Sequence, residues 1–292
     1  MTDWISTSLD LLRSTVQDDG GWPYYASGGS AVEPTAMAVA ALHAHQSDAP
    51  RVEAGLRFIL AMQQPDGSLL PQAGQSQGTG LGMAAGIVLA AHPASRAAAD
   101  RVADHALSWK PETAPRTEDI SNDGSLIGFS WIPGVFSWVE PTAYGVLLME
   151  RTGRGDHPRT VEARRVLRDR AVPAGGWNYG NSIVLGSALE AVVMPTALVL
   201  LALGSDRKGR EVTGGVKYLE QEAAAGGGHS PLSLGWMNLA LRARNREGVS
   251  ADHLGDALKS SPRIAVSPWH HAMALLAVAP LERIPFVVGG AS

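Results

Sequence analysis

The chain has 292 residues, a formal net charge of −4 and no cysteine. Acidic and basic residues are interspersed, which argues against a nucleic-acid-binding surface, and the lack of cysteine excludes disulfides, thiolate metal sites and a cysteine nucleophile. No segment reaches ~18 uncharged apolar residues, the length of a membrane-spanning helix. The first residues carry an acid early and lack a basic stretch before an apolar core. We therefore expect no secretory signal and a cytoplasmic location.

A unit of three parts repeats along the chain: a charged amphipathic helix, a Gly-rich turn and an apolar helix. The charged helices are predicted at residues 3–16, 50–63, 95–109, 158–170, 210–223 and 250–260. The apolar helices are predicted at residues 34–45, 79–91, 141–150, 195–204, 231–243 and 268–279. Three apolar helices open with Pro-Thr-Ala, at Pro34, Pro141 and Pro195. Proline is favoured at the first helical position because its fixed φ suits a helix and its missing N–H has no partner there.

This repeat predicts the architecture. A helix that is apolar on every side must be buried on every side, whereas a helix with one apolar stripe covers a core and faces water. Six of each kind in alternation predict an all-α (α/α)6 toroid with an inner and an outer ring of helices. No alternation typical of strands persists between turn residues. Because no linker interrupts the rhythm, we expect one domain over residues 1–292.

The long connections of this toroid all precede inner helices, roughly at residues 17–33, 64–78, 110–140 and 171–194. Function usually collects on long loops, and most aromatic residues fall in or just after these, as in a pocket for an apolar or flat ligand. Trp22 and Trp177 belong to the repeat itself and are interpreted as structural. The predicted ligand contacts are Tyr24, Trp131, Phe136, Trp138, Tyr179, Trp236 and Trp269, with His229 and His270 as hydrogen-bond donors.

Two carboxylates occupy the same position in two repeats, directly before Pro-Thr-Ala: Glu33 and Glu140. A carboxylate at a helix N-terminus can be a cap that the helix dipole stabilises. Two equivalent carboxyls in one cavity are also what acid–base chemistry uses. The dipole lowers a carboxyl pKa and burial raises it, so the sequence leaves both roles open.

Metal and cofactor motifs are lacking. The pairs His43 with His45 and His270 with His271 do not have the i, i+4 spacing of a helical metal site, and no nucleotide-binding loop or nucleophile elbow occurs. We therefore predict no metal ligands and no cofactor, with Mg²⁺ required only if the substrate is a diphosphate.

The turn at Gln17-Asp18-Asp19-Gly20-Gly21-Trp22 resembles the repeats of the terpenoid cyclase and protein prenyltransferase superfamily, in particular those of squalene-hopene cyclases. The resemblance implies an (α/α)6 toroid. Class II terpene cyclases carry Asp-x-Asp-Asp-Thr-Ala at an inner-helix start, and Glu33 and Glu140 fall on the position of their proton donor when Thr-Ala is aligned. The motif's other two acidic positions are not acidic here. The protein prenyltransferase branch needs a Cys in its zinc site, which this chain lacks.

The resemblance implies a terpenoid cyclase-like protein, an isomerase or lyase, that binds an isoprenoid or another apolar ligand in a central aromatic cavity. One alternative is a carbohydrate-active toroid, a polysaccharide lyase or hydrolase, since Gly20-Gly21-Trp22-Pro23 is similar to a pectate-lyase repeat. Another is a non-catalytic module that binds a lipid or a partner. The sequence leaves open whether the protein contacts a membrane peripherally.

Overall fold

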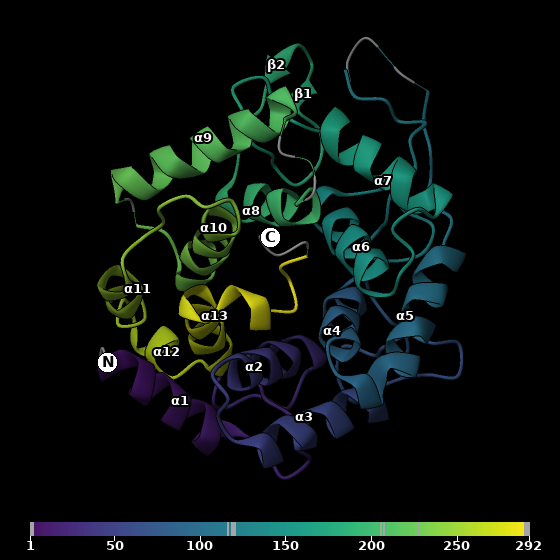
Figure 1. The fold of residues 1–292 in the computed structure, drawn as a ribbon. Helices are drawn as coiled ribbons and strands as arrows, with labels where there is room; N and C mark the ends of the chain where they lie inside the picture. Colours follow the sequence, from purple (N-terminus) through teal and green to yellow (C-terminus); the bar gives the residue numbers. More distant parts are fainter. Residues whose placement is uncertain are drawn as a thin grey trace.

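The computed structural model describes residues 3–115, 117, 121–204, 206, 208–226 and 228–288. Its helices form two concentric rings (Figure 1). The outer ring consists of α1 (Asp3–Thr15), α3 (Ala49–Ala61), α5 (Arg96–Ser108), α7 (Pro158–Asp169), α9 (Arg210–Ala225) and α11 (Ala251–Ala257). The inner ring consists of α2 (Val32–Ala44), α4 (Leu81–Ala90), α6 (Val139–Arg151), α8 (Val193–Ala202), α10 (Pro231–Ala243) and α13 (Pro268–Val278).

The inner ring is closed. Each inner helix contacts the next one in chain order, and α13 contacts α2. Every outer helix packs on inner helices, and α1 packs on α13, so the first helix of the chain covers the last inner helix. The predicted all-α (α/α)6 toroid is confirmed, with all twelve predicted helices in their places.

Burial separates the two rings as the sequence predicts. In α2 every residue except His43 is buried, whereas α1 buries only Trp4, Ser8 and Leu12, one stripe at i, i+4 spacing. The inner helices therefore form the core, and the outer helices shield it from water.

The proline position differs from the prediction. Helices α2, α6 and α8 begin two residues earlier than expected, so Pro34, Pro141 and Pro195 are their third residues. The first four N–H groups of a helix have no partner within it, so a missing N–H costs nothing at this position either. Glu33 and Glu140 consequently lie inside their helices, at the second residue, rather than before them.

The threonine of each Pro-Thr-Ala fixes the turn that precedes it. The hydroxyl oxygens of Thr35, Thr142 and Thr196 accept the backbone N–H of Trp22, Phe129 and Trp177 at 2.8, 3.1 and 2.8 Å. All three threonines are fully buried, where an unpaired N–H would be costly. This recurring bond positions each turn against its inner helix.

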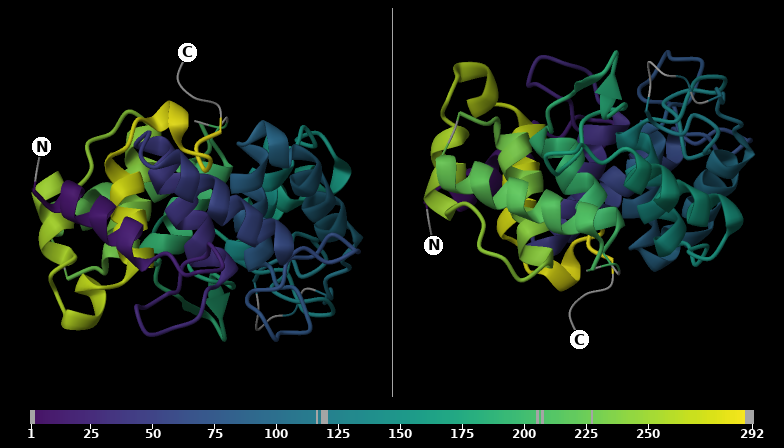
Figure 2. Two further views of the ribbon diagram at one scale, coloured as in Figure 1. Left: turned by 90° about the horizontal axis from the view of Figure 1, so that it is seen from below. Right: turned by 90° about the horizontal axis from the view of Figure 1, so that it is seen from above.

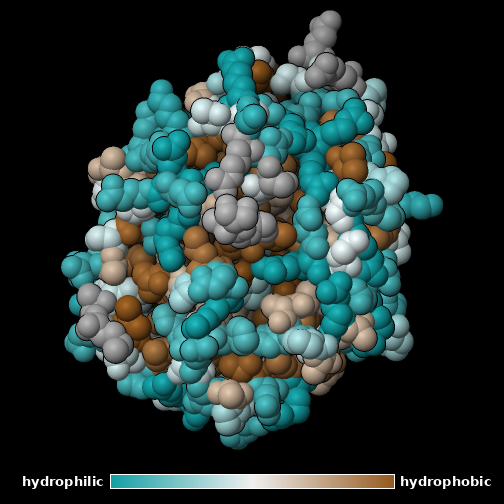
Figure 3. Space-filling view, in the orientation of Figure 1, coloured by the Kyte–Doolittle hydropathy of each residue, from teal (hydrophilic) through white to brown (hydrophobic). Residues whose placement is uncertain are grey.

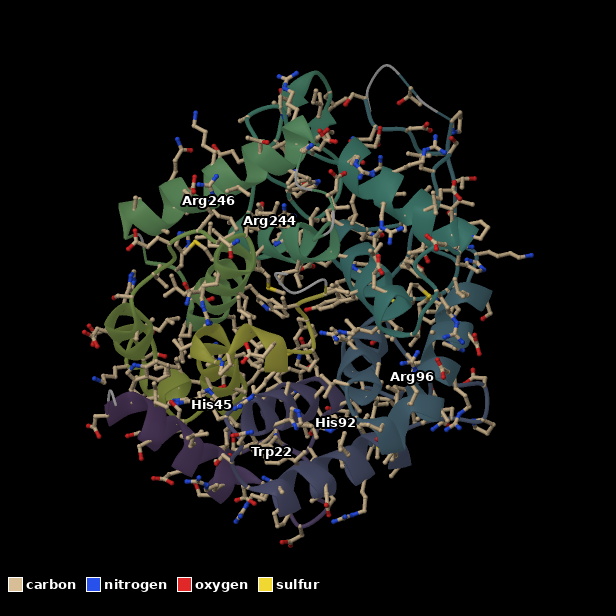
Figure 4. The ribbon with its side chains drawn as sticks, in the orientation of Figure 1. Trp22, His45, His92, Arg96, Arg244 and Arg246 are labelled. Carbon is tan, nitrogen blue, oxygen red and sulfur yellow. The ribbon has the colours of Figure 1, made fainter. Side chains whose placement is uncertain are left out.

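The tryptophans of the repeat join the rings. Trp22 and Trp177 are fully buried, and their indole N–H groups donate to the carbonyls of Leu12 and Leu167 in outer helices at 2.8 and 2.5 Å. Figure 4 shows Trp22 between α2 and α3. The structural interpretation of both is confirmed. Phe129 takes this place in a third unit, where its ring covers Gly145 so closely that a Cβ there would lie 2.2 Å from it.

The predicted absence of long strands is confirmed for the described residues, which contain only a short hairpin, β1 (Ile183–Val184) paired antiparallel with β2 (Ser187–Ala188). Leu185 and Gly186 at its tip have φ of 50° and 74°, as a two-residue hairpin turn requires. Strands of two residues are too short for a visible alternation. The remaining elements are α12 (Pro262–Ala265) and the 3₁₀ helices η1 (Pro93–Ser95) and η2 (Leu281–Arg283).

The two ends of the toroid differ. The long loops that precede the inner helices gather at one end, here called the loop end (Figure 2). The segment after α13 lies at the opposite end, which faces the viewer in Figure 1 and shows mixed hydrophilic and hydrophobic residues in Figure 3. Glu33 and Glu140, at inner-helix starts, therefore lie toward the loop end.

Candidate functional site

Two buried carboxyls face the interior at the loop end. Glu33 in α2 is 7% exposed and Glu140 in α6 is 8% exposed. Helix α4 lies between α2 and α6 in the inner ring, yet the charge of Glu33 raises the pKa of Glu140. The two side chains therefore lie within electrostatic reach of each other, although their helices are not neighbours. The structure thus brings the two sequence-predicted acids together.

Both carboxyls hold a proton more tightly than usual. Burial raises the pKa of Glu33 to about 6, although the Tyr24 hydroxyl, which donates to Oε2 of Glu33 at 2.6 Å, acts in the lowering direction. Burial, followed by the Glu33 charge, raises the pKa of Glu140 to about 7. Desolvation therefore outweighs the helix dipole, the balance that the sequence left open. Near neutral pH a large share of Glu140 is protonated.

Tyr24 links Glu33 to the start of α13. Its ring meets Trp269 edge to face at 5.1 Å, and its carbonyl accepts the Ser267 hydroxyl at 2.7 Å. Because that hydroxyl hydrogen is used, Nδ1 of His270, 2.7 Å away, donates to the Ser267 oxygen. Burial, with the neighbouring His271, lowers the pKa of His270 to about 4. His270 is therefore neutral near pH 7 and acts as a hydrogen-bonding group.

An aromatic stack lies deeper in the ring, and of its three members only the middle one, Trp236, was predicted from the sequence. Trp236 of α10, 3% exposed, meets Tyr144 of α6 at 6.3 Å and Phe286 at 5.1 Å, edge to face in both cases. Burial and then the charges of Glu33, Glu140 and Tyr24 raise the pKa of Tyr144. Tyr144 stands one turn after Glu140, a spacing that could have revealed it. Phe286 lies outside every repeat, so the repeat pattern could not predict its position.

Three predicted ligand contacts form the rim of the loop end. Phe136, Trp138 and Tyr179 are 47%, 42% and 48% exposed. Phe136 and Trp138 line a pocket of about 260 Å³ together with Asn122, Arg170 and Asn181. The carbonyl of Tyr179 accepts the N–H of Val139 at 3.0 Å, and Glu140 contributes to the raised pKa of Tyr179 after burial. Trp138 and Tyr179 thus flank the start of the helix that carries Glu140.

The other two predicted contacts are Trp131 and His229, which contact residues other than Glu33 and Glu140. Trp131 is half-buried, with its carbonyl 2.7 Å from the N–H of Gly80 and its ring against that glycine. The Nε2 atom of His229 lies 2.9 Å from a carboxylate oxygen of Glu222 in the outer helix α9. The structure therefore places His229 on the outer ring.

A larger cavity of about 490 Å³ opens elsewhere, between α1 and α11 beside Trp4. Within the described ranges, no three His, Asp or Glu side chains come together in a group that could hold a metal ion. No described helix has both the length and the apolar character needed to cross a membrane.

Comparison with solved structures reveals whole-chain similarity. A novel alpha-amylase from Clostridium perfringens has a TM-score of 0.63 at 10% identity, covering 94% of this chain and 96% of its own. A variant of the type II terpene cyclase MstE from Scytonema, in complex with its substrate geranylgeranyl dihydroxybenzoate, has a TM-score of 0.59 at 13% identity, covering 98% of both chains. This chain shares their fold. That fold is an (α/α)6 toroid.

A protein from Actinoplanes is also similar, with a TM-score of 0.57 at 15% identity, covering 94% of this chain and 96% of its own. No protein family model and no curated protein matches the sequence. At these identities the structural likeness concerns the fold, and the function has to be argued from the site.

Proposed function

We propose that this protein binds an apolar, isoprenoid-type ligand at the loop end of the ring and that Glu140 protonates an alkene of that ligand, as in class II terpene cyclisation. The observation that carries the proposal is the buried Glu140, whose pKa is raised to about 7 beside a second buried carboxyl. A general acid works best when its pKa lies near the operating pH. A plain helix cap would need no such burial.

The proposed step is a proton transfer from the Glu140 carboxyl to one alkene carbon. The π electron pair of the alkene forms the new C–H bond, the other carbon becomes a carbocation, and Glu140 is left as a carboxylate. A neighbouring π bond of the ligand then attacks the cation and closes a ring. Loss of a proton from the final cation ends the sequence, and a proton returns to Glu140.

The surroundings of Glu140 suit this chemistry. Tyr24 holds Glu33 by a hydrogen bond to its carboxylate, which favours the charged form of Glu33, and a negative charge nearby stabilises a developing cation. The rings of Tyr144 and Trp236 lie on the interior side of the acids, and aromatic faces attract cations. The chemistry needs no metal or cofactor; Mg²⁺ would be needed only with a diphosphate substrate.

The carbohydrate-active alternative rests on the same acid pair, because glycoside hydrolysis also uses two carboxyls with different roles, and on the similar alpha-amylase. A sugar, however, needs many polar partners for its hydroxyls. The residues that meet in the interior, Tyr144, Trp236 and Phe286, are buried aromatic side chains. That surface suits an isoprenoid chain better, as does the substrate named for MstE.

Ligand binding separates these classes. We expect squalene or a farnesyl derivative to quench the tryptophan fluorescence saturably, because Trp138 and Trp236 would lie at the ligand. Trp138→Phe should weaken the quenching, whereas Trp22→Phe, at the fully buried repeat position, should leave it unchanged. Saturable quenching by malto-oligosaccharides or oligogalacturonate, with none by isoprenoids, would favour the carbohydrate alternative instead.

A further inference from the structure

The segment after α13, residues 280–288, crosses the opening of the ring opposite the loop end (Figures 1 and 2). Arg151, the last residue of α6, holds it in place. Its Nε donates to the carbonyl of Pro285 at 2.7 Å, and its Nη2 donates to those of Ile284 and Val287 at 3.1 and 2.8 Å. The guanidinium of Arg151 thus binds three backbone carbonyls between Ile284 and Val287, which fixes the path of the segment.

Phe286 projects from this segment into the ring. Its side chain is fully buried and meets Trp236 edge to face, with ring centroids 5.1 Å apart and planes at 82°. Trp236 in turn meets Tyr144. These two residues belong to α10 and α6, between which α8 lies in the inner ring. The three rings therefore meet in the interior of the toroid.

The depth of this stack follows from helix geometry. Tyr144 is four residues beyond Glu140, which corresponds to ~6 Å along α6 at about 1.5 Å per residue. Trp236 is the sixth residue of α10, ~8 Å from the start of that helix by the same rise. The stack therefore begins about one turn below Glu140, although α6 has 13 residues. Behind Trp236, the side chain of Phe286 fills the interior from the end opposite the loop end.

We propose that Phe286 determines the length of the apolar chain that the ring accepts. A chain that enters at the loop end passes Glu33 and Glu140 and ends against Trp236, which the fully buried ring of Phe286 supports from behind. The inference deepens the proposed function, on which it rests for the apolar ligand and its entrance. Arg151 contributes as a positioning residue, because its three hydrogen bonds keep Phe286 in the interior.

The test compares Phe286→Ala with Phe129→Ala. Phe129 is also buried, at 2% exposed, but packs in the repeat turn against Gly145 of α6. Binding of n-alkanols from hexanol to hexadecanol, and of geraniol, farnesol and geranylgeraniol, is measured by calorimetry. Phe286→Ala should move the affinity optimum to longer chains, with a gain of at least ~10-fold for them, since each newly buried methylene contributes about fourfold. Phe129→Ala should keep the original optimum.

An unchanged optimum in Phe286→Ala, or an equal shift in Phe129→Ala, would overturn the proposal. If Phe286→Ala does not fold, Phe286→Leu is tested instead and is expected to move the affinity optimum less far, again to longer chains. An unchanged optimum in Phe286→Leu would then overturn the proposal. A shift seen with alkanols, in a protein that binds no prenyl alcohol, supports the role of Phe286 and contradicts the isoprenoid function. If no chain of either kind binds, Phe286 limits nothing and the proposal is wrong.

Discussion

Replacing Glu140 with Gln is expected to lower turnover of an isoprenoid alkene by at least ~10²-fold, the usual scale for a general acid, while ligand binding persists. Glutamine keeps the shape of the side chain and has no acidic proton to donate. Glu33→Gln should have a smaller effect, because Tyr24 already holds the Glu33 carboxylate. Turnover is measured with squalene and with farnesyl and geranylgeranyl derivatives, and deuterium uptake from D₂O reports the proton transfer.

Glu150→Gln is the matched control. Glu150 lies in the same helix, but its carboxylate pairs with Arg164 of the outer helix α7, so turnover should stay within about twofold of the wild-type value, well short of the general-acid scale. If Glu140→Gln turns over normally and melts at a lower temperature, Glu140 is a structural cap and the proposed proton donation is wrong.

The same substitution should stabilise the protein at alkaline pH. The pKa of Glu140 is about 7 in the folded chain and 4.5 ordinarily, so between these values the folded state binds the proton more tightly than the unfolded state. The contribution of Glu140 to the free energy of unfolding therefore falls as pH rises from about 4.5 to 7. Above pH 7 its burial as a carboxylate costs about 3 kcal/mol, at about 1.4 kcal/mol per pKa unit.

Urea unfolding between pH 4 and pH 8 measures this dependence. The difference between Glu140→Gln and wild type should be near zero at pH 4 and reach about 3 kcal/mol in favour of the variant at pH 8. Taking the difference removes the opposite contribution of carboxyls with lowered pKa, such as Asp66 and Asp206. A variant that is less stable than wild type at pH 8 would show that the Glu140 carboxylate is stabilising and not strained by burial.

The sequence predicted the rings because their signal is repeated and long. Fully apolar helices such as α2 and striped ones such as α1 differ over more than ten residues, and Pro-Thr-Ala marks three inner helices to within two residues. The hairpin at Leu185 and Gly186 escaped because its strands have two residues each. A strand of two residues is too short to show the alternation of apolar and polar residues by which strands are recognised.

The site was predictable only in part. Equivalent positions in two repeats singled out Glu33 and Glu140, but their mutual interaction depends on ring closure, which brings α2 and α6 across the interior. Position near an inner-helix start did not distinguish His270, which joins the Tyr24 network, from His229, which pairs with an outer helix. Phe286 reaches the interior through a segment outside the repeat, so no pattern could place it.

The most direct test of the paired buried acids is a titration of the carboxyl carbons by NMR in protein labelled with ¹³C at glutamate, assigned with Glu33→Gln and Glu140→Gln. Glu140 should titrate near pH 7 and Glu33 near pH 6 in the wild type. In Glu33→Gln the Glu140 midpoint should fall, because one of its two raising causes is removed. Midpoints near 4.5 for both, with no change on either substitution, would contradict the account.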